Sequence, residues 1–332
     1  MHLALFAAIL AAAALTQTPP DGAPGAAPGG APDDAKPAAS GAGARAPGLS
    51  EGIDRAKFRW GQATDGSWVL VASFDITPGW HTYWMNPGDS GDAPSFELTV
   101  PEGWQVGETI YPRPDVKLMD GAPFYGYEGR AHYLIPVRRV GDAGDTGWNN
   151  PGGSAGSGGK WKISARIMAC RSRCTMSKAS AEGTWPPSPE AGTDINLNGG
   201  SFDGRSLPAT AAKAGLFARL ETGKVRIEGS ARGHASASFV PAAVPGMQLT
   251  LPSDAAAVAG TVDGDKFKIA CALESPGAGP RTPAFAGLVL LGRSPGDPCV
   301  WITIPHPLAG PEAAPGANGV GASDGAPPSK GG

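Results

Sequence analysis

The 332-residue sequence has few charges and no long basic run, and these absences remove several classes of protein. Only 17% of the residues are charged and the formal net charge is −3. A protein that binds nucleic acid by neutralising phosphates has a basic stripe or an excess of Lys and Arg. We therefore expect no nucleic-acid partner. The low charge, together with 50 Gly and 34 Pro, also excludes a coiled coil or a helical bundle.

A membrane-spanning segment is also missing. The longest apolar run is residues 3–15, LALFAAILAAAAL, which is shorter than the roughly 20 residues that cross a bilayer. The run resembles the apolar part of a signal peptide, with small residues at 12–14 for cleavage; a buried N-terminal helix is the alternative. We predict a cleaved signal peptide over residues 1–17 and a periplasmic or secreted protein, in a compartment where disulfides persist.

Large apolar side chains are nearly absent from both flanks of the remaining chain. Residues 18–50 and 311–332 consist mostly of Pro, Ala, Gly and Asp. Such segments cannot bury enough surface to offset the entropy cost of ordering, and we expect a disordered N-terminal linker and C-terminal tail. Residues 141–159 are expected to form a flexible loop. The predicted domains are residues 51–190 and 210–310, joined by a linker at 191–209.

The patterned regions predict strands. Apolar and polar residues alternate with period two in segments bounded by turn residues. Several short strands with regular turns are typical of β-sandwiches, so the predicted fold is all-β with two β-sandwich domains. Residues 210–222 are the one helix expected. The expected strands are residues 68–74, 133–137, 161–169, 224–228, 267–272, 287–291 and 300–304.

Two of the four cysteines, Cys170 and Cys174, are separated by three residues. Four residues of straight strand span about 13 Å, whereas bonded cysteines have Cα atoms about 4.4–6.8 Å apart. A bonded pair therefore requires the chain to reverse at residues 171–173, in a hairpin or a helical turn, and the preceding alternation favours the hairpin. So short a loop stabilises a fold by only about 2 kcal/mol, while Arg171 and Arg173 favour the thiolate. The residues favour a redox-active pair over a structural bridge or a metal site.

The other two cysteines, Cys271 and Cys299, lie on expected strands among apolar neighbours. A bridge between them would close a loop of about 28 residues and contribute roughly 3.5 kcal/mol. We predict a structural disulfide between these strands. Two buried free thiols and a second redox pair are the alternatives.

Other polar and aromatic residues admit simpler interpretations. His81 and His132 lie near the segments 79–91 and 124–129, and either could shift the pKa of the cysteine thiols. The simpler interpretation is that each is a surface histidine or a strand histidine whose ring is hydrogen-bonded. Asn86, Asp89 and Ser90 lack the carboxylate spacing of a calcium loop and indicate a turn. The tryptophans at 80, 84 and 104 are expected in the core, with a carbohydrate-binding face as the alternative.

Several segments resemble a known family, the N-terminal periplasmic domain of the thiol–disulfide interchange protein DsbD, in particular its ScsB-like relatives. The similarity covers about residues 51–310 and is looser in the second region. The segments that carry it are 79–91 (GWHTYWMNPGDSG), 111–114 (YPRP), 124–129 (FYGYEG) with the strand after it, the Cys-x₃-Cys pair, 239–241, 287–291 and 300–305.

The resemblance implies immunoglobulin-like domains and a redox role for Cys170 and Cys174. In the family the pair receives electrons from a membrane-embedded donor and passes them to exported thiol–disulfide proteins; here copper-handling proteins are a further expected partner. The family's order makes Cys174 the attacking thiol and Cys170 the resolving one, without a cofactor. Aromatic residues cap the cysteines until a partner docks, and the matching positions are Phe124 and Tyr125, with Tyr83 beside the site.

Longer family members continue into a membrane domain and a thioredoxin-like domain that this sequence does not contain. The expected function is therefore an exported thiol–disulfide carrier whose electrons come from another chain. One alternative is a Cu(I)-binding module, because Met168, Cys170, Cys174 and Met176 are soft ligands. The other is a non-catalytic β-sandwich interaction module with structural disulfides.

Overall fold

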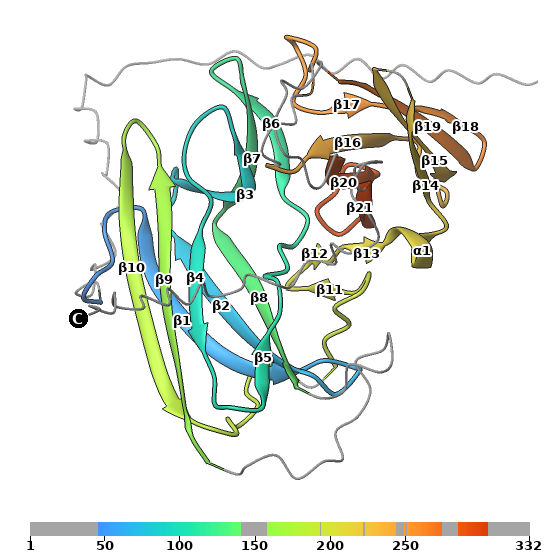
Figure 1. Ribbon diagram of the computed structural model, residues 1–332. Helices are drawn as coiled ribbons and strands as arrows, with labels where there is room; N and C mark the ends of the chain where they lie inside the picture. Colours follow the sequence, from blue (N-terminus) through green and yellow to red (C-terminus); the bar gives the residue numbers. More distant parts are fainter. Residues whose placement is uncertain are drawn as a thin grey trace, which may run out of the picture. The chain divides into compact units, whose positions relative to one another are not determined.

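The computed structural model describes residues 46–140, 158–192, 194–221, 223–243, 249, 251–273 and 285–304, and strands dominate them (Figure 1). The first ten strands form two antiparallel sheets, in the orders β1-β2-β8-β5 and β10-β9-β3-β7-β6, and β4 pairs with β9. Their bounds are β1 Ile53–Gln62, β2 Trp68–Ile76, β3 His81–Gly88, β4 Ser95–Thr99, β5 Trp104–Val106, β6 Asp115–Met119, β7 Ala122–Glu128, β8 Arg130–Arg139, β9 Lys160–Cys170 and β10 Cys174–Thr184.

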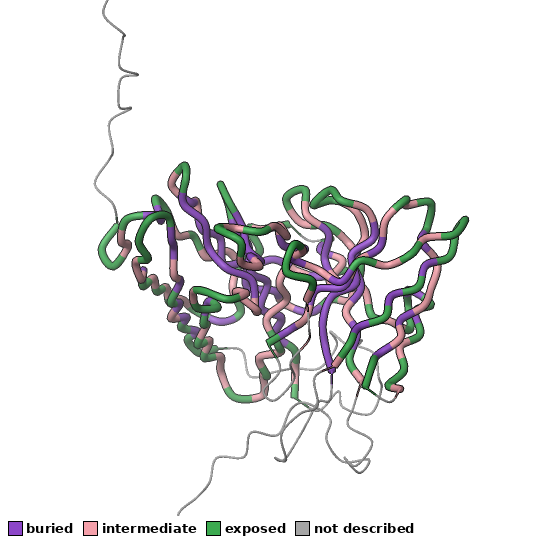
Figure 2. Tube along the Cα trace, turned by 90° about the horizontal axis from the view of Figure 1, so that it is seen from above, coloured by how far each residue is buried: buried purple, intermediate pink, exposed green. Residues whose placement is uncertain are grey.

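These two sheets pack face to face over a shared apolar core. Phe74 and Tyr133 come from the first sheet and Tyr127 and Ile167 from the second, and all four are fully buried in one cluster. In Figure 2 the buried residues follow the middles of the strands, while the turns are exposed. Alternation explains the arrangement, because every second side chain of a strand faces the same side. A second cluster gathers five tryptophans, at positions 60, 68, 104, 161 and 185.

Two further sheets form a second sandwich, in the orders β13-β21-β20-β16-β17 and β14-β15-β19-β18. Phe239 and Phe285 of one sheet stack with ring centroids 4.8 Å apart, and Val225 and Ile269 of the other complete the core. The short β11 Ser201–Phe202 and β12 Arg205–Ser206 form a hairpin of their own. The other bounds are β13 Ala209–Thr210, β14 Phe217–Glu221, β15 Lys224–Ser230, β16 Ala237–Pro241, β17 Val258–Ala259, β18 Thr261–Asp263, β19 Lys266–Ala272, β20 Phe285–Leu291 and β21 Cys299–Ile304.

The all-β fold is confirmed, and each expected strand coincides with an observed one. The helix expected at 210–222 is wrong beyond its first turn. The helix α1 covers only Ala211–Ala214, with the Thr210 hydroxyl accepting from the Lys213 N–H. Gly215 ends it in the left-handed conformation, at φ 67°, which glycine adopts without steric cost. The following residues pair as β14 with β15.

The segment 191–209 was expected to be a linker, but several of its described residues pack on the first sandwich. Ile195 and Leu207 are buried against Val69 and Leu134. Asp203 accepts a hydrogen bond from His132 at 2.7 Å. The described residues of this segment thus belong to the packed structure. The domain limits at 190 and 210 stay a prediction.

Arg113 joins the two sandwiches. It is only 3% exposed, and its guanidinium donates to four backbone carbonyls of the second sandwich, at 2.7–3.1 Å. The acceptors are the oxygens of Leu291, Gly292, Asp297 and Pro298. Burial lowers the pKa of Arg113 from its ordinary value, and Asp297 partly opposes this shift. Carbonyl dipoles rather than a buried carboxylate thus satisfy the cation.

Several predicted segments lie outside the described residues: the signal peptide at 1–17, most of the linker at 18–50, nearly all of the loop at 141–159 and the tail at 311–332. Residues 46–50 are described, and Leu49 packs against the core while the Ser50 and Ser177 hydroxyls hydrogen-bond at 2.8 Å. In the part of the chain that the structure describes, no helix has the length and hydropathy of a membrane span.

Candidate functional site

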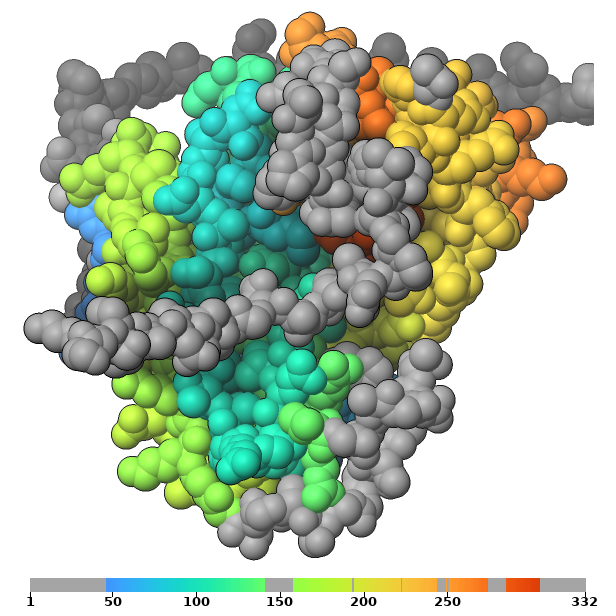
Figure 3. Space-filling view, in the orientation of Figure 1, coloured from blue at the N-terminus to red at the C-terminus, as the bar shows by residue number. Residues whose placement is uncertain are grey.

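The cysteine pair lies at the turn of the β9–β10 hairpin, which is at the surface in Figure 3 (yellow-green). The two strands pair without a break from Lys160↔Thr184 to Cys170↔Cys174. Cys170 and Cys174 form a disulfide across the ladder. The Arg171 N–H donates to the Arg173 carbonyl at 3.0 Å. The predicted reversal at residues 171–173 is therefore confirmed.

The two cysteines differ in access to solvent. Cys170 is 3% exposed, whereas Cys174 at the start of β10 is exposed. A partner can therefore reach the sulfur of Cys174 more easily than that of Cys170. The exchange chemistry of a disulfide depends on which sulfur is accessible, so the asymmetry favours Cys174 as the point of contact.

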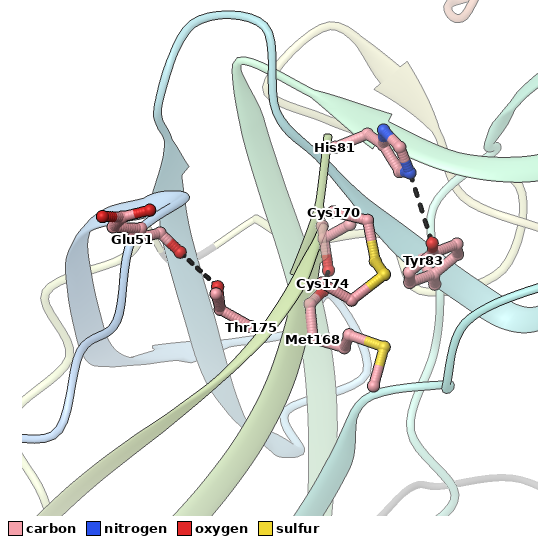
Figure 4. Close-up of a disulfide and its surroundings, with 8 residues drawn as sticks. Glu51, His81, Tyr83, Met168, Cys170, Cys174 and Thr175 are labelled. Atoms are coloured by element: carbon pink, nitrogen blue, oxygen red, sulfur yellow. Dashed lines mark hydrogen bonds between the residues drawn. A yellow bond between two sulfur atoms is a disulfide. The ribbon is translucent and has the colours of Figure 1, made fainter. Parts of the chain in front are cut away.

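An aromatic and methionine cover encloses Cys170. Tyr83 and Phe124 are buried beside it, with ring centroids 5.9 Å apart, and Met119 and Met168 pack against the same cluster. In Figure 4 the disulfide sulfurs point towards Tyr83, and Met168 lies beside Cys174. Gly126 makes room for this packing, because a Cβ there would lie 2.6 Å from Phe124 Cζ.

Tyr125, expected beside Phe124 in the cap, faces the other side of β7. It lies in the core, and its hydroxyl donates to the Ala256 carbonyl at 2.7 Å. Adjacent residues of a strand point to opposite faces, so only one of the pair can cover the cysteines. The structure brings Tyr83 and Phe124 to the disulfide and keeps Tyr125 away from it.

His81 is the residue that the sequence reasoning set aside and the fold brings to the site. It is 7% exposed and lies directly opposite Cys170 in the β3–β9 ladder and opposite Glu128 in the β3–β7 ladder. Its Nε2 is 3.2 Å from the Tyr83 hydroxyl (Figure 4). The sequence contained a signal for this position, because His81 is two residues from the predicted site residue Tyr83 and therefore lies on the same face of the strand.

The electrostatics of this face come from a few groups. Burial lowers the pKa of His81 from its ordinary value, with Glu128 raising it and Lys117 lowering it to smaller extents. Burial raises the pKa of Tyr83. Lys117 forms an ion pair with Glu128 at 2.5 Å and lies 5.4 Å from the centroid of the Phe124 ring. Burial thus favours the neutral form of the His81 imidazole.

The two arginines of the turn have different surroundings. Both are exposed, and Arg173 forms an ion pair with Glu51, which reduces its effect on the thiols. The Glu51 carbonyl also accepts from the Thr175 hydroxyl at 2.5 Å. Thiolate stabilisation by Arg171 and Arg173 stays a prediction.

The loop after β3 supports Tyr83. Gly91, at φ 94°, lies against the Tyr83 ring, where a Cβ would lie 2.2 Å from Cζ. Asn86 Oδ1 accepts from the Gly88 N–H at 3.1 Å. This is the turn chemistry expected for the segment. The glycines of the motif let the loop approach the aromatic cover closely.

The predicted disulfide between Cys271 and Cys299 is wrong, because both are free, buried thiols. Cys271 faces the interior of the second sandwich. Cys299 is on the opposite face of β21 from the core residue Val300, and its thiol is 3.8 Å from the Ser206 carbonyl. Burial raises the pKa of both thiols to about 12, so neither is a nucleophile at neutral pH.

The remaining candidates are structural. His132 is buried between the Ser73 hydroxyl, at 2.9 Å, and Asp203, and is a satisfied strand histidine as expected. Trp80 and Trp84 are buried in the core. Trp104 packs with Trp185, with centroids 4.7 Å apart. Within the described ranges, no three His, Cys, Asp or Glu side chains are grouped to hold a metal ion.

A match to a family model covers the residues of this site. Residues 53–183 match the family model described as "Thiol:disulfide interchange protein DsbD, N-terminal". A solved structure, the N-terminal periplasmic domain of ScsB from Proteus mirabilis, matches at 15% identity and a TM-score of 0.42, covering 74% of this chain and 90% of that one. The curated proteins searched include no match. The matched range contains Cys170, Cys174 and their aromatic cover, so residues 53–183 resemble the DsbD N-terminal domain at the candidate site.

Proposed function

We propose that this protein is an exported thiol–disulfide exchange carrier that passes electrons through Cys170 and Cys174. The observation that carries the proposal is the asymmetry of the pair: an exposed Cys174 bonded to a Cys170 enclosed by aromatic side chains. A purely structural bridge across three residues adds little stability. The family match to a thiol–disulfide interchange domain supports the same function.

In the proposed reaction, the Cys174 thiolate attacks a partner disulfide and forms a mixed disulfide, while one partner sulfur leaves as a thiolate. Cys170 then attacks Cys174 Sγ. The Cys170–Cys174 bond forms, the bond to the partner breaks, and the partner leaves reduced by two electrons. Exchange needs only thiols and disulfides, so no cofactor is invoked, and Phe124 and Tyr83 shield the resolving sulfur until the partner docks.

The partners follow from the chemistry. A membrane-embedded thiol–disulfide protein is the proposed electron donor, which regenerates the thiols after each turnover. The proposed acceptors are exported thiol–disulfide or copper-handling proteins. The proposed location is the periplasm or outside the cell, after cleavage of a signal peptide.

The reduction potential of Cys170–Cys174 tests the proposal. The mature protein is equilibrated in defined thiol buffers, and alkylated cysteines are mapped. We expect a midpoint between about −270 and −120 mV, the span of exchange proteins. Cys271 and Cys299 serve as internal controls, because they are alkylated only after unfolding. A midpoint below about −300 mV would make the bridge structural and favour the interaction module.

A second candidate function rests on one further observation. The β9–β10 register pairs Met168 with Met176 and Cys170 with Cys174, so the four sulfur side chains share one face of the hairpin. Thiolates and thioethers are suited to Cu(I). If this face is a copper site, the reduced protein binds Cu(I) and the double variant Met168→Leu, Met176→Leu binds it more weakly. Equal Cu(I) affinity in both proteins contradicts a role for the thioethers.

A further inference from the structure

A row of side chains crosses four strands of the second sheet. Glu128 of β7 is opposite His81 of β3, His81 is opposite Cys170 of β9, and Cys170 is opposite Cys174 of β10. Directly opposed residues of an antiparallel ladder share a face, with Cβ atoms about 4.5–5.5 Å apart. His81 therefore shares a face of the sheet with Glu128 and Cys170 and occupies the position between them in this row.

The second step of the exchange reaction needs a proton acceptor at this place. Cys170 attacks as a thiolate, but burial favours its protonated form. The side chains packed around it in the described residues are those of Tyr83, Phe124, Met119 and Met168, with His81 opposite. His81 is the one among them whose neutral side chain is a base, because the free imidazole nitrogen can take up a proton.

We propose that His81 accepts the Cys170 proton when Cys170 resolves the mixed disulfide, with Glu128 and Tyr83 as positioning residues. The inference rests on the proposed function and adds a residue to it. The proton moves from Cys170 Sγ to the imidazole as Sγ bonds to Cys174. The partner sulfur leaves with the bonding electron pair and takes up a proton from solvent or from the imidazolium. Glu128 stabilises the imidazolium while it exists.

The groups that face His81 set the expected pH dependence. Burial lowers the pKa of His81 and so favours the neutral ring, which can accept a proton. As the pH falls through this lowered pKa the ring becomes charged, and we expect resolution to slow. Glu128 opposes this shift and Lys117 reinforces it. Among the described residues, the titratable or charged groups that face His81 are Glu128 on β7, Lys117 on β6, Tyr83 on β3, Cys170 on β9 and Cys174 on β10.

The test separates the two steps. The reduced full-length protein is mixed with oxidised glutathione, quenched with acid at set times and analysed by mass spectrometry for reduced, glutathionylated and oxidised forms. In His81→Gln we expect the mixed disulfide to form at the normal rate and to be resolved about 10²-fold more slowly. His132→Gln is the matched control, a buried histidine distant from the cysteines, and resolves at the normal rate.

Each outcome decides a different point. Unchanged resolution in His81→Gln overturns the role of His81 and leaves the carrier function intact. If the wild-type protein becomes neither glutathionylated nor oxidised, the proposed function fails and this inference fails with it. Should His81→Gln not fold, Glu128→Gln replaces it: removing the carboxylate lowers the pKa of His81, so the inflection in the resolution rate moves to lower pH. An unmoved inflection contradicts the proposal.

Discussion

Replacing Cys174 by serine is expected to abolish thiol–disulfide exchange, lowering its rate by at least about a thousandfold. Cys174 is exposed and is the proposed attacking residue, and a serine hydroxyl does not replace a thiolate as nucleophile. Cys170→Ser is expected to behave differently. It keeps the first step and accumulates a mixed disulfide, because the resolving thiol is missing. Mass spectrometry of both variants after incubation with oxidised glutathione measures the difference.

The reverse pattern would contradict the assigned order. If Cys170→Ser were inert and Cys174→Ser formed the mixed disulfide, the buried sulfur would be the attacking one. The aromatic cover of Tyr83 and Phe124 would then have to open before the first step. Cys271→Ser is the matched control, since this thiol is buried and its pKa is raised to about 12.

Replacing Arg113 by methionine is expected to lower the free energy of unfolding by about 3–5 kcal/mol. Methionine fills much of the space but cannot donate to the four carbonyls that the guanidinium satisfies. Buried acceptors left without donors cost about 1–3 kcal/mol each, less where water enters. Arg113→Lys should restore part of the loss, because an ammonium group has three donors but lacks the planar geometry of guanidinium. Urea unfolding followed by tryptophan fluorescence measures the effect.

An exposed arginine provides the control for this effect. The side chain of Arg219 is 68% exposed and pairs with Glu221 at the surface, where such pairs contribute at most about 1 kcal/mol. Arg219→Met should therefore change the unfolding free energy little. A loss in Arg113→Met as small as that in Arg219→Met would mean that water satisfies the carbonyls and that Arg113 does not hold the two sandwiches together.

The local sequence pattern was sufficient to predict the strands and the β9–β10 hairpin. Alternation in residues 161–169 marked the buried face of β9, and the separation of Cys170 and Cys174 required a reversal between them. Both are short-range properties, because strand period and turn length depend on a few neighbouring residues. The resemblance to the DsbD family also rested on contiguous motifs, and the family match over residues 53–183 confirmed it.

The face of the sheet that each side chain occupies, and the register between strands that are distant in sequence, could be read only from the tertiary structure. Tyr125 and Phe124 are neighbours in sequence, yet the packing of β7 sends one into the core and the other to the disulfide. Cys271 and Cys299 both lie on strands, but the faces that they occupy keep them apart. His81 meets Cys170 only because β3 lies between β7 and β9 in a particular register. A shift of one residue would reverse the face of each side chain, and long-range packing sets that register.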